Sequence, residues 1–129
     1  MILDIQNHPD TQIYGDESRI AQVIRILLDN AIKYSDNGET VIINVKANQF
    51  HEEINGTTIS IIDNGIGIKQ EDLSKVFDLF YRGSDLEHIE GSGLGLFIAK
   101  EIVHLHQGKI FIESAWQKGS TFSVVFPNE

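Results

Sequence analysis

Residues 57–68 read TTISIIDNGIGI, an alternating apolar run followed by a turn that contains two glycines. Its first seven residues place two isoleucines on the same side as Asp63, because side chains alternate along a strand. The pattern predicts a strand whose apolar face ends in a carboxylate. Gly65 and Gly67 follow directly, and glycine lets the backbone approach another group closely. Burying a carboxylate is costly without a hydrogen-bond donor, so we expect a binding site where this strand ends.

The chemistry of this strand end favours a planar heterocycle with an exocyclic amine. Such a ring would donate a hydrogen bond to Asp63 and stack against Ile66 and Ile68. Adenine fits this description, and guanine also presents an amine, so these residues leave the base open. Asp-Asn-Gly is also an ordinary turn sequence, and taken alone it is a weak signal.

The segments around this strand alternate between strand and helix patterns. Apolar residues at helical spacing predict a long helix up to Tyr34, with Asp16 as its N-cap. A second long helix is expected at 94–105 with Gly108 as its C-terminal cap, and a short amphipathic helix at 70–77. Extended segments are expected at residues 2–5, 11–14, 41–45, 57–63, 109–114 and 121–126, with a polar hairpin loop at 48–56. The pattern predicts an α+β two-layer sandwich, in which one mixed sheet carries helices on one face.

Length and composition narrow the class of protein. A chain of 129 residues fits a single domain, residues 1–129, with a real core. The net charge of −9 argues against nucleic-acid binding, which needs a basic face, but not against nucleotide binding. No cysteine occurs, and the five histidines show no metal-ligand grouping and suit structural or surface positions. Because the chain has no cysteine, no signal-peptide pattern and no membrane-spanning run, we expect a cytoplasmic domain.

A second set of polar residues lies at the end of the first long helix. Asn30, Lys33 and Tyr34 share one helical face beside the apolar stripe. The amide oxygen of Asn30 suits a hard cation such as Mg²⁺, which keeps several waters and takes phosphates as ligands. Lys33 suits a phosphate as a point charge. Taken alone, this helix is interpreted more simply as one with a polar C-terminal turn.

A third set combines glycines with the start of the second long helix. Residues 91–96 read GSGLGL, and helix N-termini hold phosphates with their free N–H groups. No Gly-Lys-Ser/Thr occurs, so this is not a P-loop, and a glycine hinge is the alternative. The charged stretch at 84–91 predicts a flexible lid. Before it, Phe77 and Tyr81 suit packing against the core or the lid, and Arg82 suits a terminal phosphate.

The order of these motifs resembles that of one family, the bacterial sensor histidine kinases. The matching segments are the N box at 24–35, the G1 box at 63–67, the F box at 76–82, the G2 box at 91–96 and the closing glycine turn at 118–122. The likeness is to the ATP-binding catalytic domain and covers about residues 11–127. It implies the Bergerat-type sandwich shared with gyrase, Hsp90 chaperones and MutL. That fold has a mixed, mostly antiparallel sheet of about five strands, three helices on one face and a flexible ATP lid, here at about 82–93.

The resemblance implies ATP and Mg²⁺ as cofactors and gives the motifs their roles. Asn30 would ligate Mg²⁺, and Asp63 would bind the adenine amine. Lys33 and Arg82 would meet the phosphates as candidate stabilisers of the transfer. The nucleotide-binding residues that it implies are Asn30, Lys33, Tyr34, Asp63, Gly65, Ile66, Gly67, Ile68, Phe77, Tyr81, Arg82, Gly91, Ser92, Gly93, Leu94, Gly95, Leu96 and Thr121.

The resemblance also implies a function in two-component signal transduction. The domain would supply the ATP γ-phosphate for autophosphorylation of a histidine on a separate dimerisation domain. Its partners would be that dimerisation domain and, through it, a response regulator, within a homodimeric and membrane-located parent kinase. The excised domain would be monomeric. None of the five histidines lies in the acceptor motif, so the transfer needs the other domain.

One position departs from the family pattern. The N box usually has an asparagine four residues before the metal-binding one, and gyrase and Hsp90 have a glutamate there, whereas this chain has Ile26. Isoleucine neither ligates a cation nor activates water, so the metal shell would rest on Asn30 and water, without self-contained ATP hydrolysis. Two alternatives stay open: an anti-sigma-factor-type serine kinase, and a regulatory domain that binds nucleotide without full catalysis.

Overall fold

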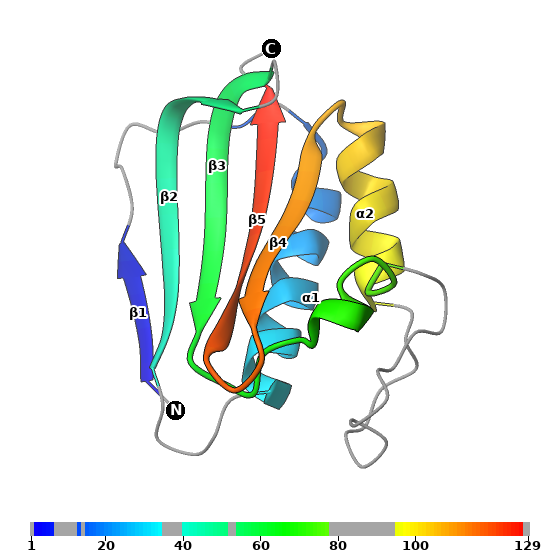
Figure 1. Cartoon of the computed structure of the whole chain (residues 1–129). Helices are drawn as coiled ribbons and strands as arrows, with labels where there is room; N and C mark the ends of the chain where they lie inside the picture. Colours follow the sequence, from blue (N-terminus) through cyan, green and yellow to red (C-terminus); the bar gives the residue numbers. More distant parts are fainter. Residues whose placement is uncertain are drawn as a thin grey trace.

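The part of the chain that the structure describes folds into a two-layer sandwich of one sheet and two long helices (Figure 1). The structure is a computed structural model that describes residues 2–6, 13, 15–34, 40–51, 54–77 and 95–127. Its elements are β1 (Ile2–Gln6), α1 (Glu17–Tyr34), β2 (Thr40–His51), β3 (Ile54–Asp63), η1 (Gln70–Asp72), α2 (Gly95–Leu105), β4 (Lys109–Ala115) and β5 (Gly119–Pro127). Neither of the described α-helices is long and apolar enough to cross a membrane.

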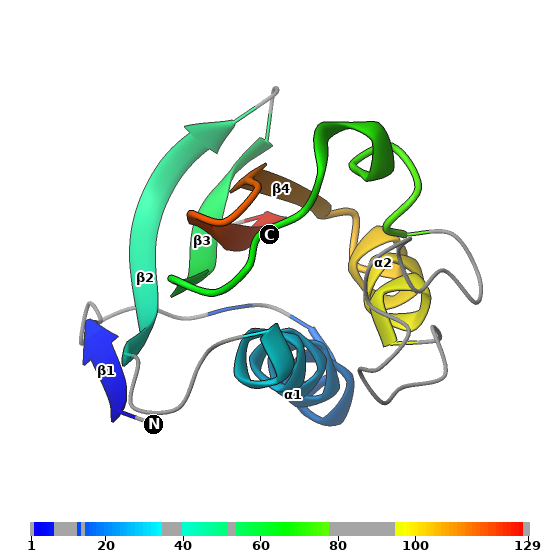
Figure 2. The same cartoon turned by 60° about the horizontal axis from the view of Figure 1, so that its bottom comes forward.

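The sheet has the strand order β1-β2-β3-β5-β4. Strands β2, β3, β5 and β4 pair antiparallel, and β1 lies parallel to β2 at one edge. Figure 2 shows α1 and α2 side by side on one face of the sheet. The predicted α+β sandwich with mostly antiparallel strands is therefore confirmed.

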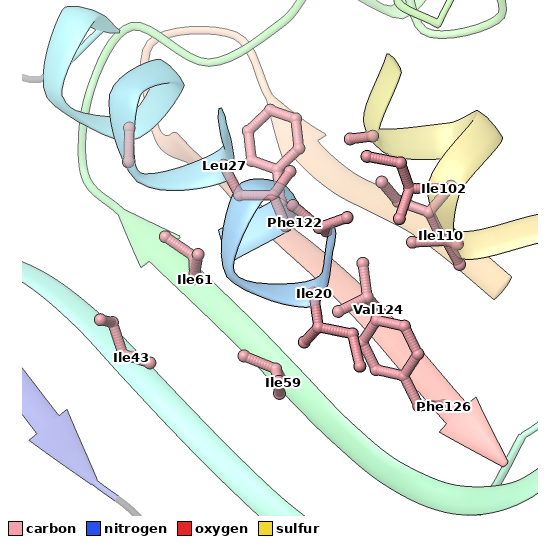
Figure 3. Packing of buried hydrophobic residues seen from close by; sticks show 14 of the residues in the cluster. Ile20, Leu27, Ile43, Ile59, Ile61, Ile102, Ile110, Phe122, Val124 and Phe126 are labelled. Carbon is pink, nitrogen blue, oxygen red and sulfur yellow. The ribbon is translucent and has the colours of Figure 1, made fainter. Parts of the chain in front are cut away.

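Three adjacent strands present matching apolar rows to the helices. Ile61 on β3 pairs with Phe122 on β5, which pairs with Ile112 on β4. The next row across the same three strands repeats this arrangement with Ile59, Val124 and Ile110. Leu27 of α1 and Ile102 of α2 pack over the rows (Figure 3). Burying each such side chain contributes about 1.5–3 kcal/mol, so these rows decide which face of the sheet the helices cover.

The start of α1 is fixed by two groups. The Asp16 carboxylate accepts a hydrogen bond from Arg19 N at 3.1 Å, so the predicted N-cap is confirmed. His106 accepts a second bond, from Asp16 N to its Nε2 at 3.0 Å, while its Nδ1 faces Ile102 O at 2.9 Å. This imidazole ties the start of α1 to the end of α2, which is the structural role expected of it.

The hairpin between β2 and β3 is longer than the sequence predicts. β2 continues to His51 and β3 begins at Ile54, so most of the loop expected at 48–56 is paired strand. The register shifts between Lys46 and Gln49, which marks a bulge. The polar side chains of this segment indicated a loop, but ladder hydrogen bonds are made by the backbone and continue wherever the neighbouring strand is aligned.

The prediction of a short amphipathic helix over residues 70–77 was wrong. Its first residues form a single 3₁₀ turn, η1, in which Leu73 N donates to Gln70 O at 3.3 Å, and turns continue to Phe77. A segment this short gains too few hydrogen bonds to offset the cost of starting an α-helix. The predicted lid at 82–93 and, except for Ile13, the extended segment at 11–14 lie outside the described residues.

The end of α2 uses a different residue from the one predicted. Gly108 was expected as the cap, but Gln107 has the left-handed conformation, with φ 61°. Gly108 N donates to Val103 O, and Gln107 N donates to His104 O, each at 2.9 Å. These two bonds form a Schellman motif, in which the left-handed position normally holds glycine. A side chain there is strained because its Cβ approaches the neighbouring carbonyl.

Replacing Gln107 with glycine is expected to stabilise the fold. The change relieves the left-handed strain at an exposed position and should add about 0.5–1 kcal/mol to the free energy of unfolding. Thermal unfolding followed by circular dichroism should show a midpoint about 2–4 °C higher. Glu101→Gly, at an exposed position inside the same helix, is the control and should lower the midpoint by a similar amount. An unchanged or lower midpoint for Gln107→Gly would contradict the strain argument.

Candidate nucleotide site

The apolar rows of the sheet end in a polar row. Asp63 at the end of β3 pairs with Ser120 of β5, and Ser120 pairs with Ser114 of β4. Because paired residues share a face and side chains alternate, all three side chains lie on the helix side, one step beyond the row of Ile61. The core therefore stops at this end of the sheet, and a carboxylate and two hydroxyls take its place.

Asp63 is the buried charged residue of this row. Its residue is 3% exposed, and its Oδ1 accepts a hydrogen bond from Gly65 N at 2.9 Å. The bond spans two residues and folds the chain into a tight turn directly after the strand. The turn keeps the carboxylate at the strand end instead of letting it rotate into solvent. Asp63 is thus a buried carboxylate held in place at the strand end, and its contact with a ligand stays a prediction.

Residues 64–68, here called the β3 loop, are packed against the turn between β4 and β5 (Figure 2). Gly67 has φ 74°, and a Cβ placed on it would collide with Ala115 O. Gly119 has φ 109°, and a Cβ there would collide with Asp63 O. Gln117 N also donates a hydrogen bond to Ile66 O. The two glycines therefore let the backbone of the β3 loop pack closely against the backbone of the β4–β5 turn. This close packing fixes the course of the loop.

The residues predicted for the phosphate end lie on α1 and at the start of α2. Asn30 is half-buried on α1, and α1 and α2 pack together. Gly95 begins α2, and a Cβ on it would lie 3.2 Å from Ile26 Cγ2 of α1. Leu96, the next residue, is half-buried against the core. The structure thus brings the predicted N-box helix beside the start of the helix that follows the G2 motif.

The side chains of several predicted site residues lie outside the described part of the structure. Lys33 and Tyr34 lie on the last turn of α1, and their side chains are outside the described part of the structure. The remaining ones outside the described residues are Tyr81, Arg82, Gly91, Ser92, Gly93 and Leu94. Phe77 is half-buried against the core, with Lys100 Nζ 5.5 Å from its ring centroid. Their contacts with a nucleotide stay predictions.

The strand register places Ser120, and not the predicted Thr121, on the same face of the sheet as Asp63. Thr121 pairs with Ile62, which puts it on the sheet face opposite to Asp63, and its nucleotide contact stays a prediction. Ser120 is the neighbour that shares the face of Asp63, and it is 7% exposed. Strand alternation in 119–127 could have identified it, since Phe122 and Val124 mark the core face.

The described part of the site offers a buried carboxylate, and its residues form no cluster of metal ligands. No group of three or more His, Cys, Asp or Glu side chains among the described residues could hold a metal ion. The buried Asp63 acceptor and the close-packed β3 loop suit a flat ring with an amine donor. Ile68, at the end of this loop, is buried in the core cluster. At the other end Asn30 offers one amide oxygen to a cation whose remaining ligands would be water and phosphate.

A family model and two curated relatives match this chain. The model, described as histidine kinase-, DNA gyrase B- and HSP90-like ATPase, matches residues 15–129. Sensor protein RprX of Bacteroides fragilis (strain YCH46) is 44% identical over 117 residues, which are 89% of this chain and 22% of that protein. Sensor histidine kinase WalK of Bacillus subtilis (strain 168) is 40% identical over 127 residues, 95% of this chain and 20% of that protein. The chain spans about a fifth of the length of these relatives.

A solved structure agrees with these matches. The mycobacterial sensor histidine kinase MprB superposes with a TM-score of 0.80 at 29% identity, covering 98% of this chain and 80% of that one. The matched residues include both long helices, the β3 loop and the turn between β4 and β5. Sequence and fold agree, and this chain belongs to the family of histidine kinase-, DNA gyrase B- and HSP90-like ATPases.

Proposed function

We propose that this chain is the ATP-binding catalytic domain of a sensor histidine kinase. It binds ATP with Mg²⁺ and presents the γ-phosphate to a histidine on a separate dimerisation domain, which in turn serves a response regulator. The observation that carries this proposal is the buried Asp63 carboxylate at the end of the core face, beside a loop that two glycines hold in place. The names of the relatives support the kinase class.

At the base end, Asp63 accepts a hydrogen bond from the exocyclic amine of adenine. Its Oδ1 is already engaged by Gly65 N, so the carboxylate is held in one orientation before the base arrives. Such preorganisation lowers the cost of ordering the site on binding. The β3 loop supports one face of the ring through Ile66 and Ile68, and the glycine contacts keep that surface in place.

At the phosphate end, the proposal assigns Asn30 to Mg²⁺ and Lys33 and Arg82 to the phosphates. The G2 motif at 91–96 binds phosphate oxygens through backbone N–H groups, since α2 begins there. ATP, when bound, supplies the phosphoryl group, and Mg²⁺ neutralises charge on the phosphates. Positioning and electrostatics carry such a transfer, so these residues bind and orient and none forms a covalent bond.

Ile26 favours a second candidate, a domain that binds nucleotide to regulate partner contacts without full catalysis. Its side chain lies within reach of Gly95 and packs against the core cluster, so it contributes an apolar contact between α1 and α2. A cation ligand is therefore replaced by helix packing. Catalysis would then depend on the single amide oxygen of Asn30, whereas nucleotide binding at Asp63 would be unaffected.

Isothermal titration of the chain with ATP and MgCl₂ is the first test. We expect a 1:1 complex with a Kd in the micromolar range or weaker. GTP should bind at least about tenfold more weakly, because its exocyclic amine stands at a different place on the ring. Absence of heat with ATP, ADP and a non-hydrolysable analogue alike would rule out the proposal.

Phosphate transfer separates the candidate functions. The chain is mixed with a purified dimerisation domain of a related sensor histidine kinase and ATP labelled in the γ-phosphate. Acid-labile label on the acceptor histidine supports the kinase proposal, and acid-stable label on a serine would favour a serine kinase. Nucleotide binding with no label at all would leave the regulatory candidate, and Ile26→Asn is the variant in which label should then appear.

A further inference from the structure

Ser114 on β4 lies at the centre of a hydrogen-bond network below the β3 loop. Its Oγ accepts a bond from Ile68 N at 2.7 Å and donates one to Gly119 O at 3.1 Å. Ser120 Oγ lies 2.8 Å away. Since a hydroxyl has one proton and two lone pairs, and the Ser114 proton goes to Gly119 O, the third bond is donated by Ser120. Every hydrogen-bonding capacity of Ser114 is therefore used.

These bonds reach both ends of the β3 loop. Ile68, at the far end of the loop, is held directly by Ser114. Gly119 packs its Cα against the backbone carbonyl of Asp63, where the loop begins, and Ser120 pairs with Asp63 across the sheet. Ser114 thus connects the start and the end of the loop through one oxygen. Networks in which each member is satisfied hold their groups in a single geometry.

Core packing alone does not require a hydroxyl at this position. The two residues that precede it on the same face of β4, Ile112 and Ile110, are apolar and belong to the core cluster or pack against it. An apolar residue at 114 would continue that face. The hydroxyl stands where the core ends and the β3 loop crosses the sheet, and it binds the backbone of that loop.

We propose that Ser114 is a positioning residue for base recognition. It holds the β3 loop and the β4–β5 turn in the arrangement in which Asp63 distinguishes the amine of adenine, and it acts through Ile68, Gly119 and Ser120 without contacting the nucleotide. This inference rests on the proposed nucleotide-binding function. It predicts that removal of the hydroxyl lowers the preference for ATP over a nucleotide that lacks the exocyclic amine.

The sheet offers a matched control on its other face. Ser60 of β3 and Ser123 of β5 form a second hydroxyl pair, with their Oγ atoms 2.9 Å apart. Their register places them on the face opposite to Asp63, and within the described residues the two hydroxyls bond each other and not the β3 loop. Ser123→Ala removes a comparable hydrogen bond from the same sheet without touching the network of Ser114.

Trp116 provides an optical reporter of the network. It is the only tryptophan in the chain and lies in the β4–β5 turn beside Gln117, whose N donates to Ile66 O of the β3 loop. Its residue is 37% exposed, and Lys69 Nζ lies 5.0 Å from its ring centroid. A shift of the β3 loop against the turn changes the surroundings of this indole and therefore its fluorescence maximum.

The test compares the binding of ATP and inosine triphosphate to four forms of the chain: wild type, Ser114→Ala, Ser114→Thr and Ser123→Ala. Inosine carries an oxygen in place of the adenine amine, so the ratio of the two Kd values measures amine recognition. We expect Ser114→Ala to weaken ATP binding about tenfold and inosine triphosphate binding about twofold, with a shifted Trp116 emission maximum. Ser114→Thr, which keeps the hydroxyl, should restore the ratio, and Ser123→Ala should leave it unchanged.

The outcomes separate this inference from the proposed function. A wild-type chain that binds neither nucleotide overturns the proposed function. A wild-type chain that prefers ATP, together with a Ser114→Ala variant that keeps the same ratio and emission maximum, overturns the positioning role alone. Should Ser114→Ala fail to fold, Ser114→Cys keeps the size of the side chain with a much weaker hydrogen bond, and an unchanged ratio in that variant is equally decisive.

Discussion

Asp63→Asn is expected to lower ATP affinity by about 100-fold or more while the fold survives. The asparagine oxygen can still accept the hydrogen bond from Gly65 N, so the turn after β3 keeps its closing bond. The other oxygen becomes an NH₂ group, which, under the proposed function, would face the adenine amine as a second donor. Loss of a charge-assisted bond and the clash of two donors act together. Isothermal titration with ATP and MgCl₂ measures the effect, and circular dichroism checks the fold.

Glu113→Gln is the control for Asp63→Asn. It makes the same change of charge on β4, which β5 separates from β3, at an exposed position on the opposite face of the sheet. Its ATP affinity should stay within about twofold of wild type, because an exposed charge at this distance is screened by salt. Equal ATP affinity of wild type and Asp63→Asn would refute the assignment of the base end to this carboxylate.

Gly67→Ala is expected to destabilise the fold and to abolish nucleotide binding. The new Cβ collides with Ala115 O, a backbone atom of a paired strand that has little freedom to move. The residue must also keep φ 74°, which a side chain adopts only with strain. Together these effects should cost about 2–4 kcal/mol in the free energy of unfolding. Urea unfolding measures this loss through the shift of its midpoint.

Gly95→Ala is the contrasting substitution for stability. Its Cβ would lie 3.2 Å from the Ile26 methyl group, which can shift, and residue 95 is helical. Alanine is the better helix former, so the free energy of unfolding should change by less than about 1 kcal/mol. If Gly67→Ala is no more destabilising than Gly95→Ala, the close packing of the β3 loop on the turn is not what holds that loop.

Local sequence patterns predicted the fold class and the buried carboxylate at the end of β3. Side chains alternate along a strand, so Ile59, Ile61 and Asp63 share one face. The strand, its buried side and the carboxylate at its end therefore follow from local stereochemistry. The helical spacing up to Tyr34 and the Asp16 N-cap were likewise readable, because a helix is specified by contacts within a few residues. The order of the motifs indicated the family, since several weak signals that occur in one fixed order are together specific.

Other features required the tertiary structure. The extension of β2 to His51 and the reduction of 70–77 to the single turn η1 depend on partners and packing that local patterns do not contain. Gly67 was predicted as part of the site from its sequence context. Only the fold shows why glycine is needed there: a side chain would collide with the carbonyl of Ala115, about fifty residues later in the chain.

The clearest contrast lies in the polar row. From sequence, Asp63 marked a binding site, whereas Ser114 and Ser120 resembled ordinary strand residues. Only the register of β3, β5 and β4 sets these three residues side by side, and only the folded β3 loop brings Ile68 N to the Ser114 hydroxyl. Local sequence fixes which way a side chain points along a strand, but the neighbours it meets depend on which strands pair and in which register.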